Sequence, residues 1–364
     1  LIDEAAFYNY ALTAPQVAAH YREGINPTRR PVPRIEIAFA SNPLATPAWT
    51  DVSPYVRAFS IRRGRQRELD RVEAGTATVT LDNRDRRFDP TNTAGPYSPN
   101  VVPMRRIRIS ALWQAQTYRL FAGFIESWPQ RWPTFGDAVV EIQCTDAFKL
   151  LNLFQLSNLS APQESSGARI GRVLDAVGWP STERAIDTGQ SQVQAGTLSQ
   201  VSALQHLQTV VETESGMLFV TGDGKVTFRN RHARILPSTT TPPTFGDAAG
   251  ELPYAELVIE YTDDQLWNLV TVSRIGGTTP GQAQDTISQA RYVTRALSKQ
   301  QLLQTTDNEC QAAAEYLVNR YANPQLVMRT MTIKPQADDA LWPVTLGREL
   351  GDRVIVRRRP PGGG

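Results

Sequence analysis

Two segments decide the fold of this chain: GTATVTLDNRDRRFDP at Gly75–Pro90 and YSPNVVPMRRIRI at Tyr97–Ile109. In the first, threonines alternate with Ala77, Val79 and Leu81, which is the period-two pattern of a strand with one buried face. The DNRD that follows is typical of a turn, because Asn and Asp side chains bond their own backbone. Four prolines then hold the connection extended until alternation resumes. The pattern predicts two scaffold strands joined by a stiff, charged connection, with no residue type that points to catalysis.

The composition limits the possible classes of protein. The chain has 364 residues, enough for two or three domains with cores of their own. Basic and acidic residues nearly balance, at 38 and 36, so the composition excludes a polycation that coats nucleic acid. Nearly all the basic residues are arginine, which fits either a GC-rich genome or bidentate pairing with carboxylates at subunit contacts. The lysines are Lys149, Lys225, Lys299 and Lys334.

Cysteines and apolar runs exclude further classes. Cys144 and Cys310 are more than 160 residues apart, so we expect two core thiols in a reducing cytoplasm and no disulfide, metal or redox site. No apolar run reaches about eighteen residues and no signal peptide is found, so no membrane span is predicted. The chain begins without Met and ends in PPGGG after a predicted strand. We therefore expect the natural polypeptide to extend beyond both ends.

Turn and linker signals divide the chain into five segments. They are 1–24, a proline-rich linker at 25–33, a β domain at 34–150, a mixed α+β domain at 151–252 and a second β domain at 253–364. Many short strands with Pro, Gly and Asn turns indicate a small barrel or sandwich in the first β domain. Its predicted strands are Ile35–Ala40, Val56–Arg62, Gly75–Leu81, Arg105–Ala111, Thr117–Ile125 and Ala138–Gln143. Those of the last domain are Ala255–Tyr261, Asn268–Arg274, Tyr292–Ala296, Val327–Lys334 and Arg353–Arg358.

Four helices are predicted from capping signals and apolar faces. Capping boxes, in which Thr is followed three residues later by Gln or Glu, open helices at Thr13, Thr197 and Thr306. A fourth helix runs through Ile170 and ends at Gly178. The last helix places a set of apolar residues inward, namely Cys310, Ala314, Leu317, Val318 and Tyr321. The hairpin MLFVTGDGKVTFRNR turns at Gly222-Asp223-Gly224, where Asp223 is turn chemistry and not a base.

Candidate catalytic and metal-binding residues are few. The histidines His20, His206 and His232 lie on three separate elements, and no metalloprotease, nucleophile-elbow, phosphate-loop or dinucleotide motif is present. We therefore assign no catalytic, cofactor-binding or metal-binding residue. Two carboxylate pairs have the residue type of a glycosidase site, but adjacent carboxylates in loops are mostly solvated and point apart. They are Asp263-Asp264 and Asp338-Asp339, and the neighbouring Trp267 and Trp342 are expected to plug barrel ends.

Arginine clusters are the most prominent charged feature. Acidic residues accompany the first two clusters, at Glu68, Asp70, Asp82, Asp85 and Asp89, which favours salt-bridged faces or subunit contacts over a nucleic-acid track. No recognition-helix motif supports sequence-specific DNA binding, although a passive DNA channel would need none. The clusters are Arg62-Arg63 with Arg65 and Arg67, then Arg84-Arg86-Arg87, Arg105-Arg106-Arg108 and Arg357-Arg358-Arg359.

The order of several segments resembles that of the minor tail or tail-hub proteins of long-tailed (siphovirus-type) bacteriophages. After the opening segments come LFAGFIESW, VVEIQCTDAFKLL, GMLFVTGDGKVTFRNR, DTISQARYVTRAL, ECQAAAEYLVNRYANPQ and LGRELGDRVIVRRRPPGGG. Relatives tend to have a tyrosine-glycine turn where this chain has Tyr292-Val293. The resemblance implies a β-rich α+β fold with two small β-barrel-type domains flanking a mixed α/β domain. It also implies a homotrimer whose six similar barrels match a sixfold tail ring.

The N-terminal LIDEAAFYNYALTAPQVAAHY resembles the closing segment of a concanavalin-like (laminin-G-like) jelly roll, a family that often binds carbohydrate. Three functions follow as expectations. The first is a structural virion protein at the phage tail tip, assembled in the host cytoplasm, which joins the distal tail ring, tape measure protein and tip or fibre proteins around a channel for genome ejection. The second is receptor or glycan binding through the upstream jelly-roll domain. The third is a cell-envelope-cleaving enzyme, for which these residues supply no acid, base or metal cluster.

Overall fold

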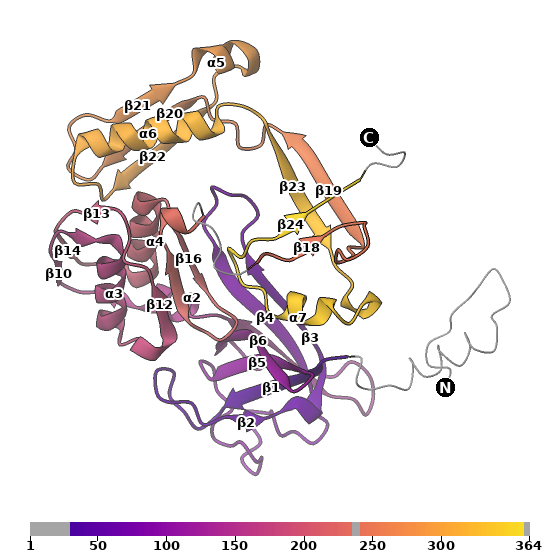
Figure 1. Cartoon of the computed structure of the whole chain (residues 1–364). Coiled ribbons are helices and arrows are strands. Elements are labelled where there is room, and N and C mark those ends of the chain that lie inside the picture. The colour runs from indigo at the N-terminus through magenta and orange to yellow at the C-terminus, as the bar shows by residue number, and fades with distance from the viewer. Residues whose placement is uncertain (1–29, 235–240, 360–364) are drawn as a thin grey trace.

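The computed structural model describes residues 30–234 and 241–359 (Figure 1). The predicted helix and jelly-roll segment at 1–24 and most of the linker at 25–33 lie outside the described residues, as does His20. The described chain is rich in β-strands and contains six α-helices. Its short 3-10 helices are η2 (Ser53–Tyr55), η3 (Ser181–Glu183), η4 (Arg231–Arg234) and η5 (Pro335–Ala337).

One eight-stranded sheet, here called the first sheet, occupies residues 32–145. Its strands pair antiparallel in the order β2-β1-β5-β6-β8-β4-β3, with β7 added to β8. All six strands predicted for this part of the chain are present. The strands are β1 (Val32–Ala38), β2 (Thr50–Asp51), β3 (Val56–Gly64), β4 (Glu73–Asp82), β5 (Arg106–Trp113), β6 (Gln116–Ile125), β7 (Gln130–Arg131) and β8 (Val139–Thr145).

The segment Gly75–Ile109 behaves as its sequence predicts, and its connection adds aromatic rings to the core. Ala77, Val79 and Leu81 are buried on one face of β4. In the connection, Asn83 accepts a hydrogen bond from the backbone N–H of Phe88 at 2.8 Å. This bond turns Phe88 inward, where it joins a stack of rings. The other rings of the stack are Phe39, Tyr97 and Trp128.

The middle region packs three helices on short strands. The helices are α2 (Phe148–Leu153), α3 (Ser166–Val177) and α4 (Ala203–Glu214). The predicted hairpin forms from β16 (Met217–Val220) and β17 (Val226–Arg229), and β12 (Arg184–Ile186) pairs with β17 in parallel. The remaining strands are β9 (Gln155–Leu156), β10 (Leu159–Ala161), β11 (Glu164–Ser165), β13 (Gln192–Val193), β14 (Gly196–Leu198) and β15 (Val201–Ser202).

The start predicted for helix α4 was wrong. Thr197 does not cap a helix, because residues 196–198 form β14 and pair with β10. Gln200 has a φ of 59°, a left-handed conformation that interrupts a right-handed helix. The helix begins instead at Ala203, where the Ser202 side chain accepts a hydrogen bond from the N–H of Gln205. Helix α3, by contrast, ends at the predicted Gly178, which has a φ of 76°.

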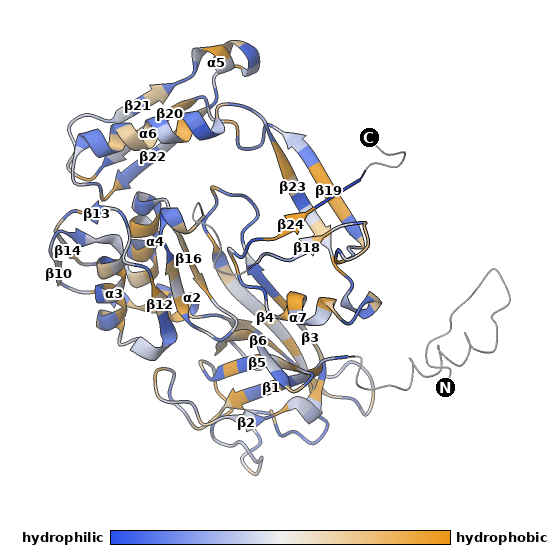
Figure 2. Ribbon diagram, viewed as in Figure 1, coloured by the Kyte–Doolittle hydropathy of each residue, from blue (hydrophilic) through white to orange (hydrophobic). Residues whose placement is uncertain are grey.

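The C-terminal region distributes its strands over three small sheets. A three-stranded sheet has the order β21-β20-β22, and α6 packs on it. The pairs β19–β23 and β18–β24 are two-stranded, and Figure 2 shows hydrophobic residues along β19 and β23. The elements are β18 (Thr244–Phe245), β19 (Glu256–Thr262), β20 (Leu269–Arg274), β21 (Gly281–Gln284), α5 (Thr286–Tyr292), β22 (Ala296–Leu302), α6 (Asp307–Tyr321), β23 (Gln325–Thr332), α7 (Leu341–Leu346) and β24 (Ile355–Val356).

The strand predicted at Tyr292–Ala296 was also wrong. Asp285 accepts hydrogen bonds from the N–H groups of Ile287 and Ser288, so a helix, α5, opens there instead. Val293 has a φ of 59° just after the helix, and the strand β22 starts only at Ala296. Aspartate is a favoured N-cap residue, so the sequence contained a signal for this helix that the strand prediction did not take into account. The helix that the sequence did predict in this region, α6, has the complete capping box of Thr306 and Glu309.

The hydrophobic clusters bind the three regions together. The cluster of the middle region includes Phe124 from β6 and Leu303, which follows β22, so neighbouring regions contribute to its core. Trp267 packs at the edge of the C-terminal cluster. Trp342 of α7 instead contacts Trp113, the last residue of β5, with ring centroids 5.8 Å apart. This tryptophan therefore lies at the end of a strand of the first sheet.

Candidate functional site

The charged turn after β4 is held by ion pairs between its own residues. Arg84 donates to Asp82 at 2.6 Å, Arg86 donates to Asp89 at 2.8 Å, and Arg87 donates to Asp85. A hydrogen bond from Arg84 keeps the pKa of Asp82 well below its ordinary value. The arginine forks of this cluster therefore contact protein carboxylates, which confirms the predicted structural pairing.

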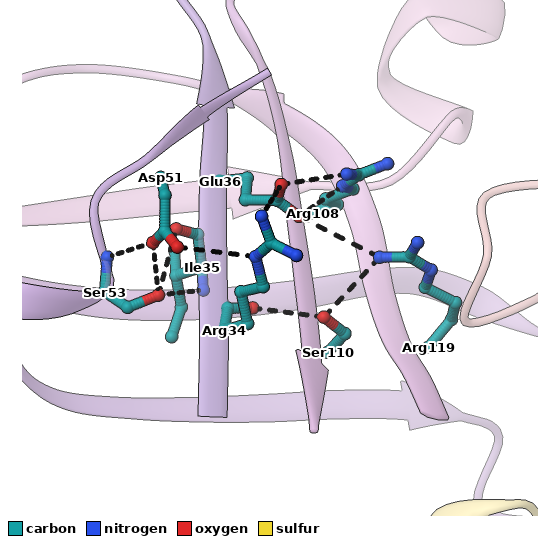
Figure 3. A network of polar contacts seen from close by, with 8 residues as sticks. All are labelled: Arg34, Ile35, Glu36, Asp51, Ser53, Arg108, Ser110 and Arg119. Atoms are coloured by element: carbon teal, nitrogen blue, oxygen red, sulfur yellow. Dashed lines mark hydrogen bonds and ion pairs between the residues drawn. The ribbon is translucent and has the colours of Figure 1, made fainter. Parts of the chain in front are cut away.

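A second network surrounds Glu36 on the polar face of β1 (Figure 3). The Glu36 side chain is only 3% exposed and accepts two hydrogen bonds from Arg108, at 2.6 and 2.9 Å. Arg34 lies 3.2 Å from the same carboxylate and Arg119 lies 3.9 Å from it. The guanidinium of Arg108 also stacks on Trp49, 4.4 Å from the ring centroid. A buried carboxylate with several cationic partners fixes the spacing of β1, β5 and β6.

A third ion pair joins three regions of the chain. Arg63, at the end of β3, donates to Glu349 at 2.5 Å and to the carbonyl oxygen of Val220 in β16 at 2.8 Å. Glu349 also accepts a hydrogen bond from the N–H of Gly222 at 2.7 Å. A side chain at Gly222 could not be accommodated, because its Cβ would lie 2.2 Å from the carbonyl oxygen of Arg119. The hairpin turn, the first sheet and the C-terminal segment thus meet at one point.

The connection between β3 and β4, residues 65–72, extends these contacts. Arg71 binds Glu212 of α4 at 2.8 Å, and Arg67 lies 3.5 Å from Asp264 in the C-terminal region. Arg320 of α6 lies 3.6 Å from Glu68. The crevices between the regions are bordered by this connection. It locks the first sheet to both other regions through charged pairs.

The C-terminal arginine cluster is also paired. Arg359 donates to Asp247 and Glu251, each at 2.8 Å, and Arg357 donates to Glu251 at 3.2 Å. The hydrogen bond from Arg359 lowers the pKa of Glu251 to about 2. These bonds fasten the strand β24 to the loop after β18. The third member of this cluster, Arg358, is exposed.

The carboxylate pairs and histidines noted in the sequence have structural partners or lie on separate elements. Asp263 pairs with Arg295, Asp264 pairs with Arg329, and Asp338 accepts a hydrogen bond from the N–H of Ala340. His206 is buried on α4, and burial lowers its pKa to about 4, with the nearby Arg169 acting in the same direction. His232 is exposed in η4. Within the residues that the structure describes, no group of three His, Cys, Asp or Glu side chains could hold a metal ion.

Sequence reasoning missed two further buried carboxylates. Glu214, at the C-terminal end of α4, is fully buried and accepts hydrogen bonds from Ser166 and from the N–H groups of Gln190 and Ser191. Asp146 accepts from the N–H groups of Gly75 and Phe148, and burial raises its pKa to about 6. Neither stands in a motif. Cys144 and Cys310 are free and buried, as predicted.

Together these networks are suited to holding regions of the chain in fixed positions. Most of the carboxylates named above accept hydrogen bonds from other elements of the chain. Across residues 30–234 and 241–359, no helix is both long and apolar enough to span a membrane.

Comparison with known proteins places this geometry in a known fold. No protein-family model and no curated sequence matches the chain. The tail protein from Neisseria meningitidis MC58 matches with a TM-score of 0.51 and 10% identity, over 80% of this chain and 76% of that one. A 43 kDa tail protein of prophage MuSo2 from Shewanella oneidensis gives 0.49 and 8%, over 80% and 78%. A prophage tail protein from Listeria monocytogenes gives 0.40 and 8%, over 74% and 72%. At such low identity, the first match shows that the chain has the fold of a tail protein.

Proposed function

We propose that this chain is a structural protein of a phage tail, which forms a hub at the tail tip around a channel for genome ejection. The observation that carries the proposal is the fold shared with the Neisseria tail protein over 80% of the chain. The collinear segments that resemble siphovirus-type hub proteins support the same role. In this proposal the protein is part of the virion, is assembled in the host cytoplasm and performs no catalysis.

The hub is proposed to be a homotrimer that joins the distal tail ring, the tape measure protein and tip or fibre proteins. Its subunit has two barrel-type domains, at 34–150 and 253–364, on either side of a mixed domain at 151–252. The Arg63–Glu349 pair and the Arg71–Glu212 pair support a rigid subunit, because they tie these parts together through side chains that are far apart in sequence. A rigid subunit suits a part that carries load between a ring and fibres. Glycan binding through residues 1–24 and an upstream jelly roll stays a prediction, since it concerns residues outside the described part.

The proposal is tested by determining the symmetry of intact tails that contain the chain. We expect threefold density for this protein at the tail tip, in contact with the tail-ring protein. Density elsewhere in the particle, or a stoichiometry other than three, would contradict the hub. A matched binding assay with purified tail-ring protein uses Arg63→Met, which should weaken binding by loosening the subunit, and Arg62→Met, an exposed neighbour that should not.

A further inference from the structure

The ribbon formed by β19 and β23 has one apolar side that the described residues leave exposed. Cross-strand pairs place Ile259 opposite Met328 and Tyr261 opposite Leu326, and directly paired residues share a face. Tyr261 and Leu326 are 71% and 72% exposed. We call this side the ribbon face, and it consists of Leu257, Ile259, Tyr261, Leu326, Met328 and Met331.

The opposite side of the ribbon carries its charged residues, and these already pair with other parts of the chain. Arg329 donates to Glu260 at 2.9 Å and to Asp264, and Arg67 of the β3–β4 connection approaches the same aspartate. The ribbon is therefore held on the molecule by its charged side. Among the described residues, no further strand pairs with β19 or β23. A two-stranded ribbon is marginally stable alone, so we expect its exposed apolar side to be buried against a partner.

A second exposed apolar feature lies in the loop between β7 and β8. Phe135 is fully exposed and Trp132 is 72% exposed. The base of this loop is anchored, because Asp137 accepts hydrogen bonds from Arg57 at 2.5 and 2.8 Å and Arg131 pairs with Glu141 at 2.5 Å. We call residues 132–136 the aromatic loop. An anchored base with two free rings is an arrangement that presents the rings to a partner.

The two features cannot meet within one chain. The aromatic loop is tied to Arg57 at the start of β3, whereas the ribbon is tied to Arg67, beyond the end of β3. Strand β3 has nine residues, so it separates these anchors by roughly 30 Å. A contact between the loop and the ribbon face therefore requires two copies of the chain. Two different patches on one chain are also what a head-to-tail ring needs.

The two patches match in size and chemistry. With typical side-chain areas, each exposes on the order of 400 Å² of apolar surface, about half of what one partner buries in a stable interface of standard size. Aromatic rings pack well on methionine sulfur and on branched aliphatic side chains. The ribbon face offers Met328 and Met331 beside Ile259 and Leu326. The remaining area would come from the polar surroundings of each patch.

We propose that the aromatic loop of one copy docks on the ribbon face of the next, as a head-to-tail contact between subunits. The inference rests on the proposed hub, because it names the residues that would join its copies. Trp132 and Phe135 supply the inserted rings, and the Met–Leu–Ile surface of β19 and β23 receives them. The contact covers both patches in every copy of a closed ring.

Cross-linking between introduced cysteines tests this contact. The native thiols Cys144 and Cys310 are buried, so a short bismaleimide reports only on introduced cysteines under native conditions. The chain carrying Thr134→Cys and Met328→Cys together keeps both rings of the aromatic loop and should give a ladder of linked copies, at least tenfold above the yield of either single variant. The mismatched control combines Thr134→Cys with Ile287→Cys on α5, a site that is more exposed than Met328.

A ladder from the mismatched pair at equal yield, or none from the matched pair, would overturn the inference. Sedimentation of the unmodified chain is measured beside it, and a monomer at every concentration would overturn it as well. Phe135→Ser should weaken self-association by about tenfold or more, while an unchanged association constant argues against the contact. The hub itself is judged by the symmetry of intact tails, so threefold tails without the 134–328 link would reject this contact and leave the hub standing.

Discussion

The first sheet and the C-terminal region have similar sequence patterns and different structures. Both alternate apolar and polar residues between Pro- and Gly-rich turns. The first sheet unites eight strands around one buried cluster, whereas the C-terminal strands divide into sheets of two, two and three. Ile109 on β5 is fully buried, and Ile259 on β19 is 41% exposed. The comparison teaches that alternation determines which side of a strand is apolar. Whether that side is buried depends on which other elements pack against it.

The largest expected effect contrasts these two isoleucines. Ile109→Ala should lower the free energy of unfolding by about 3–4 kcal/mol, because it leaves a cavity in a closed core. Ile259→Ala should cost less than about 1 kcal/mol in dilute protein, since its side chain is already partly in water. Urea unfolding of both variants measures the difference. Equal losses would mean that the ribbon face is covered within the single chain.

The second contrast compares a buried with an exposed ion pair. Glu36→Gln should cost about 2–3 kcal/mol, because the amide cannot accept both hydrogen bonds that Arg108 donates to the 3%-exposed carboxylate. Glu260→Gln on the ribbon, where the carboxylate is 44% exposed, should cost under about 1 kcal/mol. The measurement is urea unfolding at low and high salt. Only the ribbon pair should weaken markedly with salt, so a strong salt effect at Glu36 would contradict its burial.

The third contrast concerns pH. Burial raises the pKa of Asp146 to about 6 from 3.8, so between these values the folded state binds more protons than the unfolded state. Stability of the wild type relative to Asp146→Asn should therefore fall by about 2–3 kcal/mol as pH rises from 4 to 6.5. His206 titrates in both proteins and cancels in this difference.

Asp307 behaves oppositely, because a hydrogen bond from Arg274 lowers its pKa. Its contribution is lost as pH falls, which Asp307→Asn checks.

The sequence predicted local structure well where local signals were complete. Helix α6 begins as predicted, and its inward residues are buried, because the capping box and the apolar face agree. The start of α4 was missed, since a left-handed Gln200 cannot be read from residue type. The Glu36 network depends on the register of β1 against β5. The Arg63–Glu349 pair joins side chains 286 positions apart, which no local pattern encodes.

The smallest effect asks whether the C-terminal region unfolds on its own. Thr306→Ala removes the side chain that accepts from the N–H of Glu309, so it should cost about 1 kcal/mol, while Thr306→Ser keeps the cap and should cost only a few tenths. Hydrogen exchange shows where that loss is felt. If the region opens as a separate unit, amides of α6 and β20 should exchange about fivefold faster and those of β5 and β6 should not change. A uniform acceleration would instead show that the Arg63 and Arg71 contacts couple both regions into one cooperative unit. The first sheet and the C-terminal region would then differ only in how much apolar surface they expose.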